Sequence, residues 1–219
     1  MNLKKSRIYR NIFGHKKTNF IYDLQGEVNI LDIGCGNHSP STYKKINPKI
    51  NYFGIDIAEY NMDEEDYRLA NKIIYVDRSS FASSIKSLGA NFDVVISAHN
   101  LEHTDEPTLV LEAMMECLRK GGILYLSFPT ESSTKFPSRK GTLNFYDDST
   151  HSNLPNFKEV CTEILRQNGK IIYKKKKYRT IYGFFKGLLQ EPFSAFNKRL
   201  YSGTWHFWGF ETIIIAEKL

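Results

Sequence analysis

Asp32-Ile33-Gly34-Cys35-Gly36-Asn37 is the stretch that decides the fold, and it follows an apolar run that begins at Val28. A hydrophobic strand that breaks into a glycine turn before a helix leaves several backbone N–H groups exposed at one point. Those groups, with the positive helix terminus, bind an anionic part of a ligand. Asp32 stands two residues before the first glycine and would repel a pyrophosphate. The turn therefore suits a ligand that carries a positive group beside a carboxylate.

A dinucleotide-binding turn is the competing interpretation of the same residues. Its G-x-G-x-x-G pattern would use Gly34 and Gly36 and would then require a third glycine. Ser39 occupies that position. A short glycine turn is weak support by itself, so the remainder of the chain must decide between the two ligands.

Four further short strands follow at regular intervals, at residues 51–56, 72–76, 92–97 and 122–128. The first of them ends in Asp56, about twenty residues beyond the glycine turn, where a carboxylate can accept two hydrogen bonds from a ribose diol. The second ends in Asp77-Arg78, and the third runs into Ala98-His99. Strands that alternate with helical stretches predict a parallel sheet.

Several motifs resemble those of the class I S-adenosylmethionine-dependent methyltransferases. Leu31 to Gly36 resembles their motif I, Leu101-Glu102-His103 resembles the segment after their fourth strand, and Leu118 to Gly122 resembles the turn before their fifth. The resemblance implies S-adenosylmethionine as the cofactor and methyl transfer as the activity. The cofactor-binding residues that it implies are Asp32, Gly34, Cys35, Gly36, Asp56, Ile57, Asp77, Arg78, Ala98 and His99.

The expected fold is α/β, a Rossmann-like doubly wound sheet of seven mainly parallel strands with helices on both faces. The resemblance implies that the last strand is antiparallel and is inserted between the fifth and the sixth. We expect helices over residues 106–120, with Asp105 as N-cap, and over residues 156–168. The strand at 170–173 follows, and residues 205–217 are expected to form the last strand or a hairpin.

Length and composition favour a single domain of 219 residues. We divide it into a basic N-terminal helical segment (1–27), a cofactor-binding core (28–128), and a substrate-side loop and insertion (129–155 and 180–204). No apolar run is long enough to span a bilayer and no apolar signal core is visible, so a cytoplasmic protein is expected. Three widely spaced cysteines argue against a disulfide framework or a zinc site.

Net charge is +6 and lies mainly at the two ends of the chain. Six Lys or Arg and no acid occur in residues 1–20, and ten occur with Glu191 as the single acid in residues 166–200. Basic ends around an acidic centre favour an anionic partner, although a lysine-rich solvated surface gives the same pattern. We expect a small anionic substrate and no nucleic acid.

Two segments lie outside the common framework. Residues 144–151 resemble a loop of methyltransferases linked to bacterial surface-glycan synthesis, with Ser149 in place of a proline. Residues 180–201 are rich in aromatic and aliphatic side chains and could form an active-site lid, a dimer face or a helix on a membrane surface. Gly183, Gly187 and Pro192 weaken any single long helix, and the lack of a continuous amphipathic period favours a lid or a homodimer contact over a membrane.

If the methyl acceptor is a hydroxyl, a base within hydrogen-bond reach must take its proton. His151, His103 and Asp148 are the candidate catalytic residues, and each could instead be structural. His99 is expected to be a wall of the methionine pocket, and at most one of Asp147 and Asp148 is expected to act. No spacing of ligand-type residues predicts a metal site.

The sequence therefore predicts an S-adenosylmethionine-dependent methyltransferase that acts on a small polar acceptor. O-methylation of a sugar or phosphorylated glycan precursor is the leading interpretation. Methylation of a quinone or lipid-type acceptor is the second, with the apolar residues 180–201 as its pocket. A basic RNA-binding protein is the third, since the basic ends are interleaved with Tyr and Phe.

Overall fold

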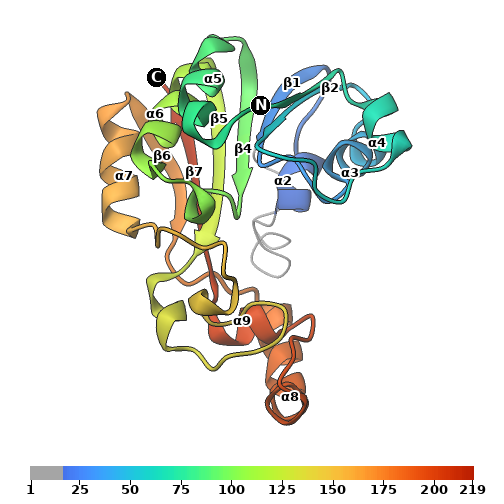
Figure 1. The fold of residues 1–219 in the computed structure, drawn as a ribbon, viewed down its shortest axis with the longest axis vertical. Coiled ribbons are helices and arrows are strands. Elements are labelled where there is room, and N and C mark those ends of the chain that lie inside the picture. The colour runs from blue at the N-terminus through green and yellow to red at the C-terminus, as the bar shows by residue number, and fades with distance from the viewer. Residues whose placement is uncertain (1–16) are drawn as a thin grey trace.

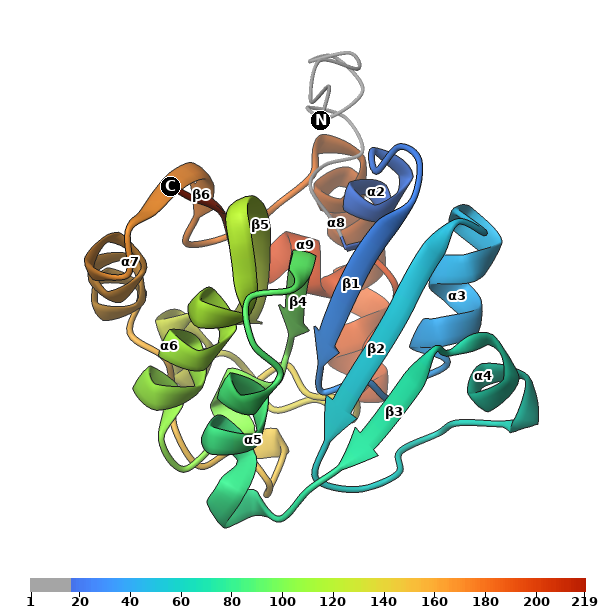
Figure 2. The ribbon, with the colours of Figure 1, turned by 90° about the horizontal axis from the view of Figure 1, so that it is seen from above.

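The computed structural model of the chain describes residues 17–219. Its centre is a seven-stranded sheet in the order β3-β2-β1-β4-β5-β7-β6 (Figures 1 and 2). The strands are β1 (Val28–Ile33), β2 (Ile50–Asp56), β3 (Lys72–Tyr75), β4 (Phe92–Ala98), β5 (Leu118–Pro129), β6 (Gly169–Lys175) and β7 (Glu211–Lys218). The last strand, β7, lies between β5 and β6 and is antiparallel to both, which confirms the expected topology.

Helices cover both faces of this sheet, as a doubly wound fold requires. Helices α5, α6 and α7 lie on one face, and α2 and α3 lie on the other (Figure 2). The helices are α2 (Lys17–Tyr22), α3 (Ser39–Ile46), α4 (Glu64–Leu69), α5 (Phe81–Ser87), α6 (Pro107–Cys117), α7 (Phe157–Arg166), α8 (Ile181–Asn197) and α9 (Thr204–Trp208). Within the expected N-terminal helical segment, α2 is helical, and residues 1–16 lie outside the described part of the chain.

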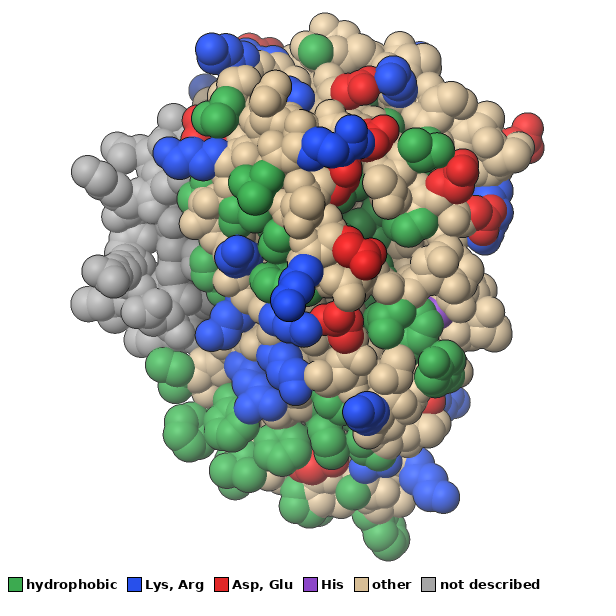
Figure 3. Space-filling model, turned by 90° about the vertical axis from the view of Figure 1, so that its left-hand side faces the viewer, with side chains coloured by type: hydrophobic (Ala, Val, Ile, Leu, Met, Phe, Trp, Pro, Cys, Tyr) green, Lys and Arg blue, Asp and Glu red, His purple; other side chains and the backbone are tan. Residues whose placement is uncertain are grey.

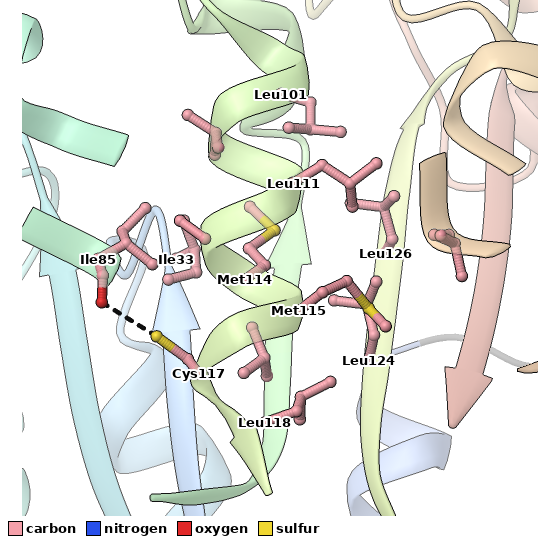
Figure 4. Packing of buried hydrophobic residues seen from close by; sticks show 14 of the residues in the cluster. Ile33, Ile85, Leu101, Leu111, Met114, Met115, Cys117, Leu118, Leu124 and Leu126 are labelled. Atoms are coloured by element: carbon pink, nitrogen blue, oxygen red, sulfur yellow. Dashed lines mark hydrogen bonds between the residues drawn. The ribbon is translucent and has the colours of Figure 1, made fainter. Parts of the chain in front are cut away.

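Two apolar clusters, one on each face, hold the helices to the sheet. The cluster beneath α6 contains Met114, Met115 and Cys117, which fill the space between α5 and the central strands (Figure 4). The Cys117 thiol donates a hydrogen bond to the carbonyl of Ile85, 3.0 Å away, so it is a packed core group. Strands β1 and β4 are buried along most of their length, and most of their residues are apolar.

Two element boundaries differ from the sequence expectation. The helix expected over 106–120 ends at Cys117, because Leu118 already pairs with Phe92 as the start of β5. Its first turn is not capped by Asp105, which instead forms an ion pair with Arg78 at 3.3 Å. In the C-terminal stretch expected to be a strand or hairpin, residues 204–208 form α9 before the strand begins at Glu211.

Residues 181–197 form one helix, although Gly183, Gly187 and Pro192 were expected to weaken it. Helix α8 runs for 17 residues and continues through Pro192, where only one i→i−4 hydrogen bond is lost. Its glycines are contact points: a Cβ on Gly187 would lie 2.2 Å from the carbonyl oxygen of Gly203, next to α9. Tight packing against α9 therefore explains why glycines, which have a low helix propensity, occur within α8.

Helices α8 and α9 lie beyond one end of the sheet (Figure 1). This is the end at which the parallel strands finish, because Glu211, three residues after α9, pairs with Pro129 at the end of β5. Across residues 17–219, no helix has the length and apolar character that crossing a membrane requires.

Candidate active site

A cavity of about 860 Å³ opens at the carboxyl ends of β1, β2 and β4. The strand order reverses between β1 and β4, and ligands of open α/β sheets bind in the crevice at such a point. Of the residues singled out in the sequence, the following line this cavity: Gly34, Gly36, Asp56, Ile57, Arg78, Ala98, His99, His103 and Asp148. Segments separated by more than 110 residues in the chain thus meet at one site.

The glycine turn presents bare backbone to this cavity. Gly34 has φ +80°, and a Cβ there would lie 2.7 Å from the side-chain amide nitrogen of Asn100. A Cβ on Gly36 would lie 2.7 Å from the backbone oxygen of Tyr60. Both positions therefore require glycine, one for conformation and space and the other for space alone.

Asp32 lies beneath the turn and outside the cavity wall. Its side chain is fully buried, and one carboxylate oxygen accepts a 2.8 Å hydrogen bond from the hydroxyl of Tyr52. Burial raises the pKa of Asp32, and the nearby charge of Lys17 lowers it in part. The second oxygen, Oδ1, has no hydrogen-bond partner within residues 17–219. Because Asp32 does not line the cavity, its charge can act on a ligand only through the turn and not by direct contact.

Cys35 is also behind the wall, where its sulfur fills the space beside Gly54. Burial raises the pKa of the Cys35 thiol well above its usual value, so the thiol stays protonated and has a packing role.

The second and third strands place their terminal acids differently. Asp56 lies on the cavity wall, and its carboxylate accepts a 2.7 Å hydrogen bond from the backbone N–H of Ile57. Burial raises the pKa of Asp56, and this N–H partly offsets the increase. Asp77 does not line the cavity. The neighbouring Arg78 does, and its guanidinium donates to the carbonyl of His103 at 3.0 Å, which ties the third strand's loop to the fourth's.

His99 is held between two buried carboxylates. Its Nδ1 lies 3.0 Å from Glu102 and its Nε2 lies 3.4 Å from Glu211. Burial lowers the pKa of His99, but the two carboxylates outweigh it and raise the pKa to about 10. Its backbone adopts φ +55°, a left-handed conformation that is uncommon outside glycine. His99 is therefore a charged part of the cavity wall at neutral pH and cannot act as a base there.

His103 is the histidine whose basic nitrogen the geometry leaves available. Thr150 Oγ1 donates its proton to Asp148 at 2.5 Å, since the carboxylate can only accept. The same oxygen lies 2.9 Å from Nδ1 of His103 and therefore accepts a hydrogen bond from that nitrogen. Burial would raise the pKa of Asp148, but the bonds from Thr150 lower it below the usual value. Asp148 thus orients His103 through Thr150, and in this orientation Nδ1 is the donor, which leaves Nε2 as the second ring nitrogen.

His151 lies behind His103. Its Nδ1 donates to the carbonyl of Phe145 at 2.6 Å, its ring stacks on the Phe145 ring, and it does not line the cavity. The His103 and His151 ring centroids are 4.8 Å apart. Asp147 points elsewhere and accepts the backbone N–H groups of Arg139, Leu143 and Asn144. The two adjacent acids therefore separate into a loop anchor, Asp147, and a cavity residue, Asp148.

Sequence reasoning gave no role to four residues that the structure places at this site: Lys17, Glu102, Thr150 and Glu211. Glu102 lies inside the Leu-Glu-His motif, but Glu211, the other carboxylate beside His99, is more than 100 residues further along the chain. Glu102, His103 and His151 have ligand-type atoms within 4.8 Å of one another. Both histidines already use Nδ1 for hydrogen bonds to Thr150 and Phe145, and the absence of a metal remains a prediction.

Comparison with known proteins agrees with this geometry. The family model described as a methyltransferase domain matches residues 6–169, well over half of the chain. The chain belongs to the methyltransferase domain family. S-Adenosylmethionine is the cofactor expected from the sequence, and the match confirms it at the level of the family.

Individual relatives and solved structures also agree with the assignment to this family. The ubiquinone biosynthesis O-methyltransferase of Cereibacter sphaeroides (strain ATCC 17029 / ATH 2.4.9) is 29% identical over 100 residues, 45% of this chain and 40% of the relative. The enzyme of that name from Ruegeria sp. (strain TM1040) is 30% identical over 96 residues, 43% of this chain and 38% of the relative. The matched region thus spans about two fifths of these relatives' length.

Among solved structures, a SAM-dependent methyltransferase from Archaeoglobus fulgidus aligns with a TM-score of 0.54 at 18% identity, over 96% of this chain and 97% of that one. An S-adenosylmethionine-dependent methyltransferase from Mesorhizobium loti aligns with a TM-score of 0.57 at 12% identity, over 88% and 92%. These similarities establish the fold, a Rossmann-like methyltransferase fold.

The residues of this methyltransferase domain fit S-adenosylmethionine. The cavity wall carries more carboxylates than cations, which favours a ligand with a net positive charge. The carboxylates are those of Asp56, Glu59, Asp105, Glu106 and Asp148, and the cations besides His99 are Lys17 and Arg78. The bare turn at Gly34 and Gly36 would hold the methionine part, and Asp56 would hold the ribose.

Proposed function

We propose that this chain catalyses S-adenosylmethionine-dependent O-methylation of a small acceptor, with His103 taking the proton of the acceptor hydroxyl. The observation that carries the proposal is the Asp148–Thr150–His103 relay on the cavity wall. A hydroxyl group is a poor nucleophile until its proton leaves, and a neutral histidine with a fixed tautomer is suited to accept that proton.

S-Adenosylmethionine, when bound, would supply a methyl group on a sulfonium. The protein's own residues position the acceptor and remove the proton of its hydroxyl group. Nε2 of His103 accepts the hydroxyl proton, while the acceptor oxygen keeps the electron pair that forms the new C–O bond. Asp148, acting through Thr150, stabilises the imidazolium that results. His151 packs against His103 and limits how its ring can turn.

A sugar or phosphorylated glycan precursor is the first candidate acceptor. Its support is the resemblance of residues 144–151 to the loop of glycan-linked methyltransferases, together with the position of this loop. Asp148 and Thr150 both line the cavity, so the loop stands where an acceptor would enter. The excess of Lys and Arg in residues 166–200 lies outside the cavity lining, so it favours an anionic partner at the surface and does not bear on the charge of the acceptor.

A quinone or lipid-type hydroxyl is the second candidate. It is supported by the relatives named ubiquinone biosynthesis O-methyltransferase, and aromatic residues lie near His99. The ring centroids of Trp205 and His99 are 5.2 Å apart, and those of Phe210 and His99 are 6.0 Å apart. Both rings lie outside the cavity lining and reach it only through His99, so the names of the relatives carry this candidate.

Transfer of a labelled methyl group separates these possibilities. The purified chain is incubated with methyl-labelled S-adenosylmethionine and with separate pools of sugar nucleotides, hydroxylated quinones and RNA. We expect label in an alkali-stable ether of one hydroxyl compound. His103→Gln should lower kcat at least tenfold with little change in cofactor affinity, whereas Tyr146→Phe, an exposed change in the same loop, should leave kcat unchanged. Label in RNA alone, or full activity of His103→Gln, would refute the proposal.

A further inference from the structure

Helix α8 turns an apolar face outward. Its exposed residues are Ile181, Tyr182, Phe185, Leu188, Leu189, Pro192, Phe193, Ala195, Phe196 and Asn197, so all but the last are apolar. Leu189 is 76% exposed and Phe196 is 87% exposed. Figure 3 shows hydrophobic side chains gathered along the lower edge of the molecule, where α8 lies in Figure 1. Contiguous exposed apolar surface of this kind marks an interaction site.

The spacing of these residues makes the face continuous. At 100° per residue, positions 181, 185, 188, 189, 192 and 196 fall on one side of the helix. The opposite side carries the small buried residues Gly183, Gly187 and Ser194, which allow α8 to approach α9 closely. A surface helix usually buries its large apolar side chains and exposes polar ones. In α8 the small side chains face the protein and the large apolar ones face outward.

Basic side chains border this apolar face. Arg179 lies over the ring of Phe184 in α8, Lys186 lies on α8 itself, and Lys198 and Arg199 follow its last residue. The one acid of the helix, Glu191, is largely buried and pairs with Arg139, so it does not neutralise the border. Lys and Arg side chains gather directly above the apolar edge in Figure 3. The border is therefore positively charged.

We propose that α8 is an interfacial helix that docks this enzyme onto an anionic lipid surface. Apolar residues that enter the boundary between headgroups and acyl chains, with Lys and Arg beside them, are the features by which such helices bind anionic membranes. A helix of 17 residues that lies in the plane of the interface does not need the length of a membrane-spanning helix. A second copy of the chain is the less suitable occupant, because a symmetric contact would bring basic border against basic border.

The position of α8 gives the docking a consequence for the site. Helix α9, against which α8 packs, carries Trp205, whose ring contacts His99 on the cavity wall. Docking would therefore hold the carboxyl end of the sheet, with the cavity, towards the headgroups. The inference does not depend on which acceptor is methylated, because no residue of α8 lines the cavity.

Vesicle flotation of the full chain tests the proposal. We expect the protein to float with phosphatidylcholine vesicles that contain phosphatidylglycerol and to bind pure phosphatidylcholine at least tenfold more weakly. The double variant Leu189→Asp/Phe196→Asp should lose at least tenfold of the binding to anionic vesicles. Leu165→Asp, an equivalent change of an exposed leucine on α7, should bind as the unmodified chain does. Circular dichroism shows whether each variant retains the fold.

Three results would overturn the inference. The first is absence of flotation with anionic vesicles, and the second is equal flotation of the folded double variant and the unmodified chain. The third concerns light scattering after gel filtration: a dimer that the double variant converts to monomers would identify α8 as a contact between copies. Failure of any of these tests leaves the methyl-transfer assay unaffected, so the two proposals are tested separately.

Discussion

Replacing Thr150 by Val tests whether Asp148 acts on His103 through the threonine hydroxyl. Valine keeps the shape of threonine and removes one hydroxyl group, so two hydrogen bonds disappear: 2.9 Å to Nδ1 of His103 and 2.5 Å to Asp148. Two backbone contacts of residue 150 are unaffected: its N–H donates to Asp148 at 2.9 Å, and its carbonyl oxygen lies 3.3 Å from Nδ1 of His103.

The structure sets the expected size of the decrease in kcat. A hydrogen bond to a charged group contributes about 1.5–3 kcal/mol, and each 1.36 kcal/mol corresponds to roughly a tenfold change in rate. The side chain of Asp148 is 34% exposed, so water replaces part of what the hydroxyl supplied. We therefore expect kcat to fall at the lower end of that range, by about tenfold, with the cofactor dissociation constant unchanged.

Two measurements check this prediction. Steady-state kinetics on the acceptor found by label transfer gives kcat, and nitrogen NMR of the histidine rings reports which ring nitrogen of His103 carries the proton. In the unmodified protein Nδ1 should carry it, and in Thr150→Val this preference should weaken. Thr162→Val, an exposed change on α7, serves as the matched control. An unchanged kcat together with an unchanged ring signal would show that the relay has no catalytic role.

Three further changes address the rest of the site. Asp56→Ala should weaken S-adenosylmethionine binding at least tenfold while thermal unfolding stays close to that of the unmodified chain, and unchanged calorimetric affinity would exclude a ribose contact. His99 has its pKa raised from 6.5 to about 10, so its contribution to stability, at most about 5 kcal/mol, is complete below pH 6.5 and is lost as pH rises through 10. Urea unfolding between pH 7 and 10.5 should show that decline, and His99→Gln should lack it. Gly187→Val would place a side chain against Gly203 and should cost about 1–3 kcal/mol of unfolding free energy. Ala195→Val, on the exposed side of α8, should cost far less, and equal losses would contradict the packing.

The sheet and the residues proposed to bind the cofactor could be predicted from the sequence, because the patterns that indicate them are local. A strand, a glycine turn and a terminal acid are neighbours in the chain, and parallel strands bring their carboxyl ends to one edge automatically. Gly34, Gly36, Asp56 and His99 consequently lie together as expected. Asp32 shows the limit of such reasoning, since spacing alone does not reveal that its carboxylate turns inward to Tyr52.

The acceptor side depended on contacts that no local pattern encodes. Adjacent residues such as Asp147 and Asp148 diverge because one accepts three backbone N–H groups of its own loop and the other meets Thr150. Likewise, His103 differs from His151 in where the two rings lie relative to the cavity, not in their neighbours along the chain. Roles of this kind follow only from the tertiary position of a loop.

Helix α8 illustrates how tertiary packing reverses a propensity argument. Glycine disfavours an isolated helix by about 1 kcal/mol relative to alanine, and that cost led to the expectation of a weakened helix. Once α9 is present, Gly183 and Gly187 are the residues that allow the two helices to touch, because any Cβ would collide with His206 or Gly203. The small residues therefore allow α8 to pack against α9, but this packing sets only the inner face and does not call for large apolar residues on the outer one. The apolar outer face thus needs a separate explanation, and its basic border is what favours the proposed anionic lipid surface as the partner.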